Sequence, residues 1–222
     1  MKGMLKLMII LALCFASTFL ILNATGLLTL DRITNWLALA QESSPILIGS
    51  IIVFLLFADL LVAMPTLTIM ILSGFFLGPF MGAAFSIMGL SLAGASGYAL
   101  SSLYGSRLVK ILIKDEVELE RAVQSFSQFG TGTILLSRAM PILPEVSACM
   151  AGLTGMSKLK FATAWMLSTI PYAVIASYAG SISTESDPKP AIIAALSLTA
   201  FFWLSWLIYR ALVINKGILK QT

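Results

Sequence analysis

Long apolar runs separated by short polar segments dominate the chain. Residues 46–104 contain one charged side chain, Asp59. Further uncharged runs occupy residues 7–22, 161–184 and 191–209, and each has a basic side chain directly at one end: Lys6, Lys160 and Arg210. An α-helix needs about 20 mostly apolar residues to cross the hydrocarbon core of a membrane. The pattern therefore predicts an all-α integral membrane protein.

The composition agrees with this interpretation. Hydrophobic residues make up 59% of the 222-residue chain, charged residues make up 11%, and the mean hydropathy is +0.97. A soluble domain carries roughly 25% charged residues, so this chain lacks the polar surface that it would need in water. It contains no histidine, which removes imidazole catalysis and most zinc sites. We expect no enzymatic activity, cofactor, metal or nucleic-acid partner.

The basic residues predict an orientation, because lysine and arginine favour the cytoplasmic side. This rule places both termini and the segments 105–121 and 158–160 in the cytoplasm, and the loops 23–45 and 185–190 outside. Residues 27–41 have helical spacing of apolar positions and are expected to form an interfacial helix.

Two segments must begin and end on the same side of the membrane. Residues 131–157 begin and end inside, yet they are too few for two crossings. Pro141 and Pro144 supply a break, so we expect a re-entrant hairpin there. Residues 46–82 must begin and end outside, with a break at Pro65. A second hairpin is the preferred interpretation, and two thin full spans satisfy the count as well.

The predicted architecture is an inverted repeat. Each hairpin is followed by a glycine-bearing segment and then by a full helix, and the two hairpins enter from opposite faces, a plan known from transporters. Four full helices are expected at about 4–22, 83–104, 161–182 and 191–212. The glycines expected to pack or turn the hairpins are Gly74, Gly78, Gly152 and Gly155.

Three parts of the chain are expected. Residues 1–44 hold the first transmembrane helix and the interfacial helix, residues 45–182 form the hairpin core, and residues 183–222 hold the last helix and a cytoplasmic tail.

Asp59, Arg138 and Glu145 are the candidate functional residues. A charge at membrane depth costs at least a few kcal/mol, so it normally faces a cavity, a partner charge or a ligand. The planar donors of a guanidinium match two phosphate oxygens at once, and carboxylates can accept protons. The structural alternative is an ion pair of Arg138 with Glu145 or Asp59 that only holds the hairpins together.

The segment RAMPILPE at 138–145 resembles the R-x-x-P-x-x-P signature of the DedA superfamily, also called SNARE-associated or VTT-domain proteins. The flanking segments agree: PTLTIMILSGFFLGPFMGA at 65–83, LYGSRL at 103–108 and AGLTGMSKLKF at 151–161. The resemblance covers roughly residues 45–182. The glutamate that directly follows the second proline, Glu145, makes the motif resemble that of the bacterial Tvp38-like branch.

This resemblance implies movement of a phosphate-bearing lipid, such as undecaprenyl phosphate or a phospholipid, between the leaflets of a bacterial plasma membrane. It implies that Arg138 contacts the phosphate and that Pro141 and Pro144 shape the second hairpin tip. Asp59 and Pro65 would have the corresponding roles in the first hairpin. Glu145 is a further candidate substrate-binding residue because of its predicted depth in the membrane and not because of the motif. Protons are the candidate coupling ion, a secondary transporter of a small anion is the alternative, and the oligomeric state is left open.

Overall fold

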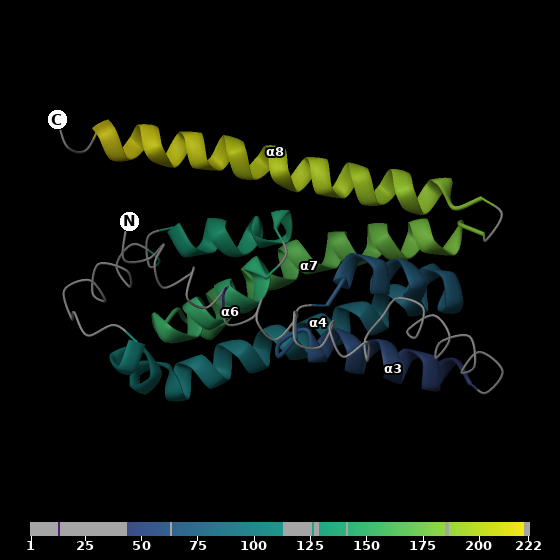
Figure 1. The fold of residues 1–222 in the computed structure, drawn as a ribbon, viewed down its shortest axis with the longest axis horizontal. Helices are drawn as coiled ribbons and strands as arrows, with labels where there is room; N and C mark the ends of the chain where they lie inside the picture. Colours follow the sequence, from purple (N-terminus) through teal and green to yellow (C-terminus); the bar gives the residue numbers. More distant parts are fainter. Residues whose placement is uncertain are drawn as a thin grey trace.

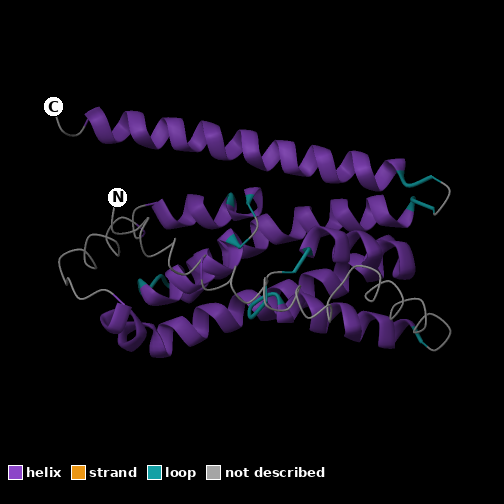
Figure 2. Ribbon diagram, viewed as in Figure 1, coloured by secondary structure: helices purple, strands orange, loops and turns teal. Residues whose placement is uncertain are grey.

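A computed structural model describes residues 13, 44–62, 64–112, 126, 129–140, 142–184 and 187–219. All regular structure in these residues is helical, and they contain no strand (Figures 1 and 2). The expected helices at 4–22 and 27–41 lie outside the described part of the chain, apart from Leu13.

The first half of the described chain contains a short helix that leads into a bent one. Helix α3, Pro45–Ala58, begins with Ser44 as its N-cap, whose side chain accepts a hydrogen bond from the Ile46 amide. Its 14 residues span only about 21 Å. After a turn, α4 extends over Thr66–Leu112 and bends at Gly78, where φ is 79° and ψ is 175°. An L side chain rarely adopts this φ, so glycine is the residue that fits the bend.

The second half contains a similar pair of short helices. Residues 129–135 are helical, and the 3₁₀ turn η1, Ser137–Ala139, leads to α6, Leu143–Leu153. Gly155, with φ of 67°, then ends α6 in a Schellman motif, in which the Met156 amide bonds to the Ala151 carbonyl. The chain continues into α7, Lys158–Ser181, and α8, Lys189–Leu219.

Helix α3 and the part of α4 before the Gly78 bend form one pair of short helices, and the helix at 129–135 and α6 form the other. The two pairs lie at opposite ends of the molecule, and the turns within them approach each other near its middle (Figure 1). The second part of α4 and α7 each extend along most of its length, and α8 lies along one side. We call residues 59–62, 64 and 65 the first tip and residues 137–140 and 142 the second tip.

Glycines allow α4 to contact its neighbours backbone to backbone. A Cβ at Gly74 would lie 1.8 Å from the Ser177 carbonyl oxygen on α7, and one at Gly180 would lie 1.9 Å from that of Ile71. Gly152 of α6 approaches the Tyr98 carbonyl in the same way, at 2.1 Å. Small residues permit such close approach of helices in a membrane protein.

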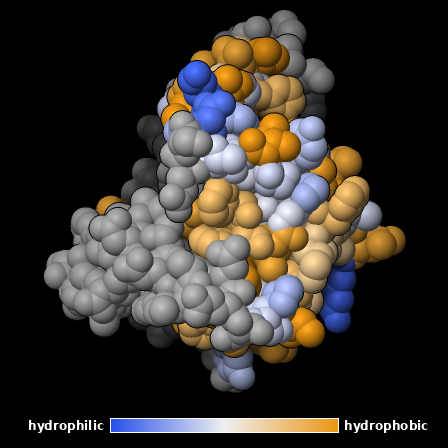
Figure 3. Space-filling model, turned by 90° about the vertical axis from the view of Figure 1, so that its right-hand side faces the viewer, coloured by the Kyte–Doolittle hydropathy of each residue, from blue (hydrophilic) through white to orange (hydrophobic). Residues whose placement is uncertain are grey.

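Three helices in the described part of the chain are long and apolar enough to cross a membrane: Thr66–Gly105, Lys158–Ser181 and Lys189–Tyr209. They overlap the expected helices 83–104, 161–182 and 191–212 over most of their lengths. The first begins earlier than expected because α4 includes the segment before the Gly78 bend. Large apolar side chains such as Leu167 and Leu196 are exposed on their outer faces. Apolar side chains also dominate the described surface in the end view of Figure 3. The chain is therefore a helical membrane protein.

Candidate functional site

The first tip contains a buried carboxyl group. Asp59 follows the last residue of α3 and is only 4% exposed. Its Oδ1 accepts a hydrogen bond of 2.7 Å from the Met64 amide, which closes the turn across five residues. Pro65 then precedes the first residue of α4. The turn thus holds the Asp59 carboxyl at the inner end of the first helix pair.

The second tip contains the buried cation. Arg138 lies in η1 and is 8% exposed. Ile142, at the N-cap of α6, has φ of 71°, an uncommon conformation for a β-branched residue. Pro144 and Glu145 occupy the first turn of α6. The positive end of a helix dipole favours a carboxylate there.

The guanidinium of Arg138 rests among neutral groups of α7. Its Nη2 donates a 3.0 Å hydrogen bond to Thr169 Oγ1. Its Cζ lies 5.1 Å from the ring centroid of Trp165 and 5.7 Å from that of Tyr172, within the range of cation–π contacts. Its Nε is buried and has no hydrogen-bond partner among the described residues. The ion pair considered as the structural alternative is not formed: Arg138 bonds to neither carboxyl in the described part of the chain.

Both tips line one cavity of about 490 Å³. The carboxyl groups of Asp59 and Glu145 both line it and lie close enough for their charges to interact. Arg138 is close enough for its charge to act on Asp59. The remaining lining residues are Met64, Pro65, Thr66, Leu67, Thr68, Ala139, Met140, Ile142, Pro144, Tyr172, Thr199 and Trp203.

Two carboxyls and one guanidinium do not form a metal centre. The described residues contain no group of three acidic, cysteine or histidine side chains that could hold a metal ion. The cavity instead offers an arginine with unused donor capacity beside two oxygen acids. These groups suit an anion with several oxygens, together with protons.

The structure brings together residues that are far apart in the sequence. Asp59, Pro65, Arg138, Pro144 and Glu145 all line the same cavity. Pro141, the other proline predicted at the second tip, lies outside the described residues. The four predicted glycines lie away from it: Gly74 and Gly152 at helix crossings, Gly78 and Gly155 at positions of positive φ.

Sequence analysis missed the residues of α7 that surround Arg138. Trp165, Thr169 and Tyr172 are spaced at i, i+4 and i+7, so they share one helix face. A tryptophan, a hydroxyl group and a tyrosine on one face of an uncharged helix were the available signal. Trp203 and Thr199 of α8, which complete the cavity, repeat this spacing of four residues.

A helical membrane protein with a buried, charged cavity between two helix tips is the class that this fold and site define. The model of the VTT domain family matches residues 64–182, more than half of the chain. The chain belongs to the VTT domain family. This family is membrane-associated, and its members are suggested to be transporters or lipid flippases. Comparison with curated proteins and with solved structures found no match.

Proposed function

We propose that the protein moves a phosphate-bearing lipid, such as undecaprenyl phosphate or a phospholipid, between the leaflets of a bacterial plasma membrane, with protons as the coupling ion. The observation that carries this proposal is the state of Arg138. It is a buried cation whose Nε has no partner among the described residues, and it lines a cavity of about 490 Å³.

A phosphate could accept hydrogen bonds from the N–H groups of Arg138 that have no partner among the described residues. The guanidinium has five N–H donors in a planar fork, and one hydrogen bond, to Thr169, is present. A phosphate can accept two parallel hydrogen bonds from this fork, which are shorter and stronger than bonds between neutral groups. Trp165 and Tyr172 support the guanidinium by cation–π contacts and do not neutralise it. Arg138 is the substrate-binding residue of this proposal.

Asp59 and Glu145 supply the coupling to protons. With both carboxyls ionised, the two acids and Arg138 carry a net charge of −1, which repels a phosphate. One proton brings the net charge to zero, and a second makes it +1. Proton binding and phosphate binding therefore favour each other, and linkage makes this effect reciprocal. The proximity of the two carboxyls supports a shared proton.

The two pairs of short helices fit the re-entrant arrangement expected from the sequence. The 14 residues of α3 span about 21 Å, which is less than the hydrocarbon thickness of about 30 Å. Opposed hairpins would bring their tips to mid-membrane, where transporters with inverted repeats bind their substrates. In this orientation the basic start of α7, Lys158 and Lys160, lies in the cytoplasm.

Cysteine labelling tests this topology. In a chain whose Cys14 and Cys149 are replaced by alanine, an impermeant thiol reagent should label Ser157→Cys only from the cytoplasmic side. It should label Ser44→Cys, at the N-cap of α3, only from the outside, where the first hairpin enters. Thr184→Cys, in the α7–α8 connection, is the control for the outside. Labelling of Ser157→Cys and Thr184→Cys from one side would overturn the arrangement.

Reconstituted vesicles test the function. The protein should speed the movement of a fluorescent phospholipid or a short-chain polyprenyl phosphate over protein-free vesicles, and more so when the donor side is acidic. The variant Asp59→Asn/Glu145→Gln should lose the response to the pH gradient, because a side-chain amide cannot take up a proton as a carboxylate does. Asp187→Asn, which removes an exposed acid outside the cavity, should retain it. Movement of neither lipid by folded protein would reject a lipid translocase.

A secondary transporter of a small anion is the second candidate. The cavity volume lies within the range of about 300–1,000 Å³ of small-molecule sites, and α8 covers one side of it through Thr199 and Trp203. Uptake of radiolabelled inorganic phosphate by the same vesicles, without lipid movement, would favour this function.

A further inference from the structure

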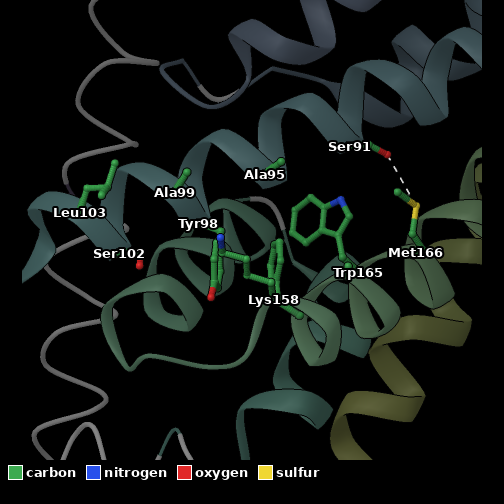
Figure 4. Close-up of a pocket in the computed structure, with 11 residues that line it drawn as sticks. Ser91, Ala95, Tyr98, Ala99, Ser102, Leu103, Lys158, Trp165 and Met166 are labelled. Carbon is green, nitrogen blue, oxygen red and sulfur yellow. Dashed lines mark hydrogen bonds between the residues drawn. The ribbon is translucent and has the colours of Figure 1, made fainter.

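A second cavity lies between α4 and the first half of α7, with a volume of about 450 Å³. One side of it is lined by small side chains of α4: Ala95, Ala99 and Ser102 (Figure 4). These side chains are exposed, so the cavity opens on the outer surface of the helices. Phe161 and Trp165 of α7 line the other side. We call this cavity the lateral groove.

The lateral groove has two different ends. At one end, the Ser91 hydroxyl lies 3.7 Å from the Met166 sulfur and joins the two helices (Figure 4). At the other end, Lys158, the first residue of α7, extends towards Tyr98 of α4. Lys158 is the charged residue of the lining, and it is exposed. The groove is thus an apolar channel with a cation at one end.

The length of the lateral groove fits one leaflet of a membrane. From Ser91 to Leu103, α4 advances twelve residues, or about 18 Å. One leaflet contributes about 15 Å, half of a hydrocarbon core of about 30 Å. The Lys158 side chain approaches Tyr98, seven residues or about 11 Å along α4 from Ser91. The headgroup of a lipid whose acyl chain fills this part of the groove would therefore meet Lys158, whose long side chain can extend towards the interface.

Trp165 separates the lateral groove from the Arg138 cavity. Its indole lines the groove, while the Arg138 guanidinium lies 5.1 Å from the centre of its ring. The ring is fixed in place, because its Nε1 donates a 3.2 Å hydrogen bond to the Leu90 carbonyl. A Cβ at Gly94 would lie 2.3 Å from the ring, so the glycine provides its space. The two cavities are neighbours with different linings.

We infer that the lateral groove is a binding site for an anionic glycerophospholipid, distinct from the Arg138 cavity. One acyl chain lies between α4 and α7, and the headgroup phosphate pairs with Lys158. The combination of an apolar slot of leaflet length and a cation at one end selects an anionic lipid over a zwitterionic one. Binding at this site does not depend on lipid movement, so it stands or falls apart from the proposed function.

Quenching of Trp165 fluorescence by brominated lipids tests this site. In a variant with Trp36, Trp203 and Trp206 replaced by phenylalanine, Trp165 is the remaining tryptophan. Phosphatidylglycerol with brominated acyl chains should quench it at about one-fifth of the concentration needed for brominated phosphatidylcholine. This fivefold difference corresponds to about 1 kcal/mol, which is what one lysine contributes to binding an anionic membrane surface. Native mass spectrometry of the unaltered chain with the same two lipids gives an independent measurement.

Three variants locate the lipid. Lys158→Gln should remove the preference for phosphatidylglycerol. Ala99→Phe should fill the groove and reduce quenching by both lipids, whereas Leu167→Phe, on the exposed face of α7, should leave it unchanged. Arg138→Ala should keep the preference, and its loss there would place the lipid in the Arg138 cavity. Equal binding of both lipids in the unaltered chain, or quenching unaffected by Ala99→Phe, would overturn the inference.

Discussion

Replacement of Arg138 by alanine should abolish lipid translocation in reconstituted vesicles. The variant removes the cation that we propose to bind phosphate, and it leaves the acids Asp59 and Glu145 as the charged groups of the cavity lining. Arg138→Lys should restore only part of the rate, because an ammonium keeps the charge but lacks the planar fork. A hydrogen bond to a charged group contributes about 1.5–3 kcal/mol, so the lysine variant should bind phosphate about 10- to 100-fold more weakly.

Thr169→Val separates binding from positioning. This variant keeps the guanidinium and removes the 3.0 Å hydrogen bond that orients it. We expect a smaller loss of rate than in Arg138→Lys. The thermal unfolding midpoint in detergent provides the control for folding. If Arg138→Ala and Glu145→Ala both prevent folding, the charged cluster stabilises the hairpins, and its proposed role in transport fails.

The largest loss of stability is expected at the crossing of α4 and α7. In Gly180→Ala the new Cβ would lie 1.9 Å from the backbone oxygen of Ile71, a group that cannot move without its helix. Forcing an extra group into a packed core costs typically about 1–3 kcal/mol and occasionally more. The free energy of unfolding, measured by denaturant titration in mixed micelles, should fall by at least this amount.

Gly97→Ala is the matched control for this variant. Its Cβ would lie 2.9 Å from Leu60 Cδ1, the end of a flexible side chain that can move away. The same substitution should therefore cost much less at residue 97 than at residue 180. Helix propensity favours alanine over glycine at both positions, so equal losses would mean that the close approach to a backbone atom at residue 180 does not determine the effect.

The sequence predicted the helical membrane fold because each charge in an apolar run is informative. Asp59 is the single charged residue among the 59 residues of the run 46–104, and the prolines near Arg138 mark a break. Depth and helix breaks together identified the three charged residues that now line one cavity. The orientation of each apolar helix was not predictable, since α7 has no charged face that would distinguish its two sides. Trp165, Thr169 and Tyr172 were therefore missed.

The bends were predicted less well than the charges. The break expected at Pro65 coincides with the turn between α3 and α4. The sharp change of direction inside the following apolar segment depends on Gly78. Gly78 was among the glycines expected to pack or turn the hairpins, but nothing in the sequence distinguished it as the position of the bend. The contact of Arg138 with Thr169 joins residues 31 positions apart, a separation that no local pattern encodes.

The hydrogen bond between Asp59 and the Met64 amide gives one carboxyl group two tasks. The same side chain closes the first tip and faces the Arg138 cavity. A bond to a charged acceptor is roughly twice as strong as one to a neutral acceptor, so a proton that neutralises Asp59 also weakens the closure of the turn. The protonation state of Asp59 and the geometry of the turn are thus coupled through the hydrogen bond between the Met64 amide and Asp59 Oδ1. Protonation of Asp59 in the cavity would therefore also loosen the turn that connects α3 to α4.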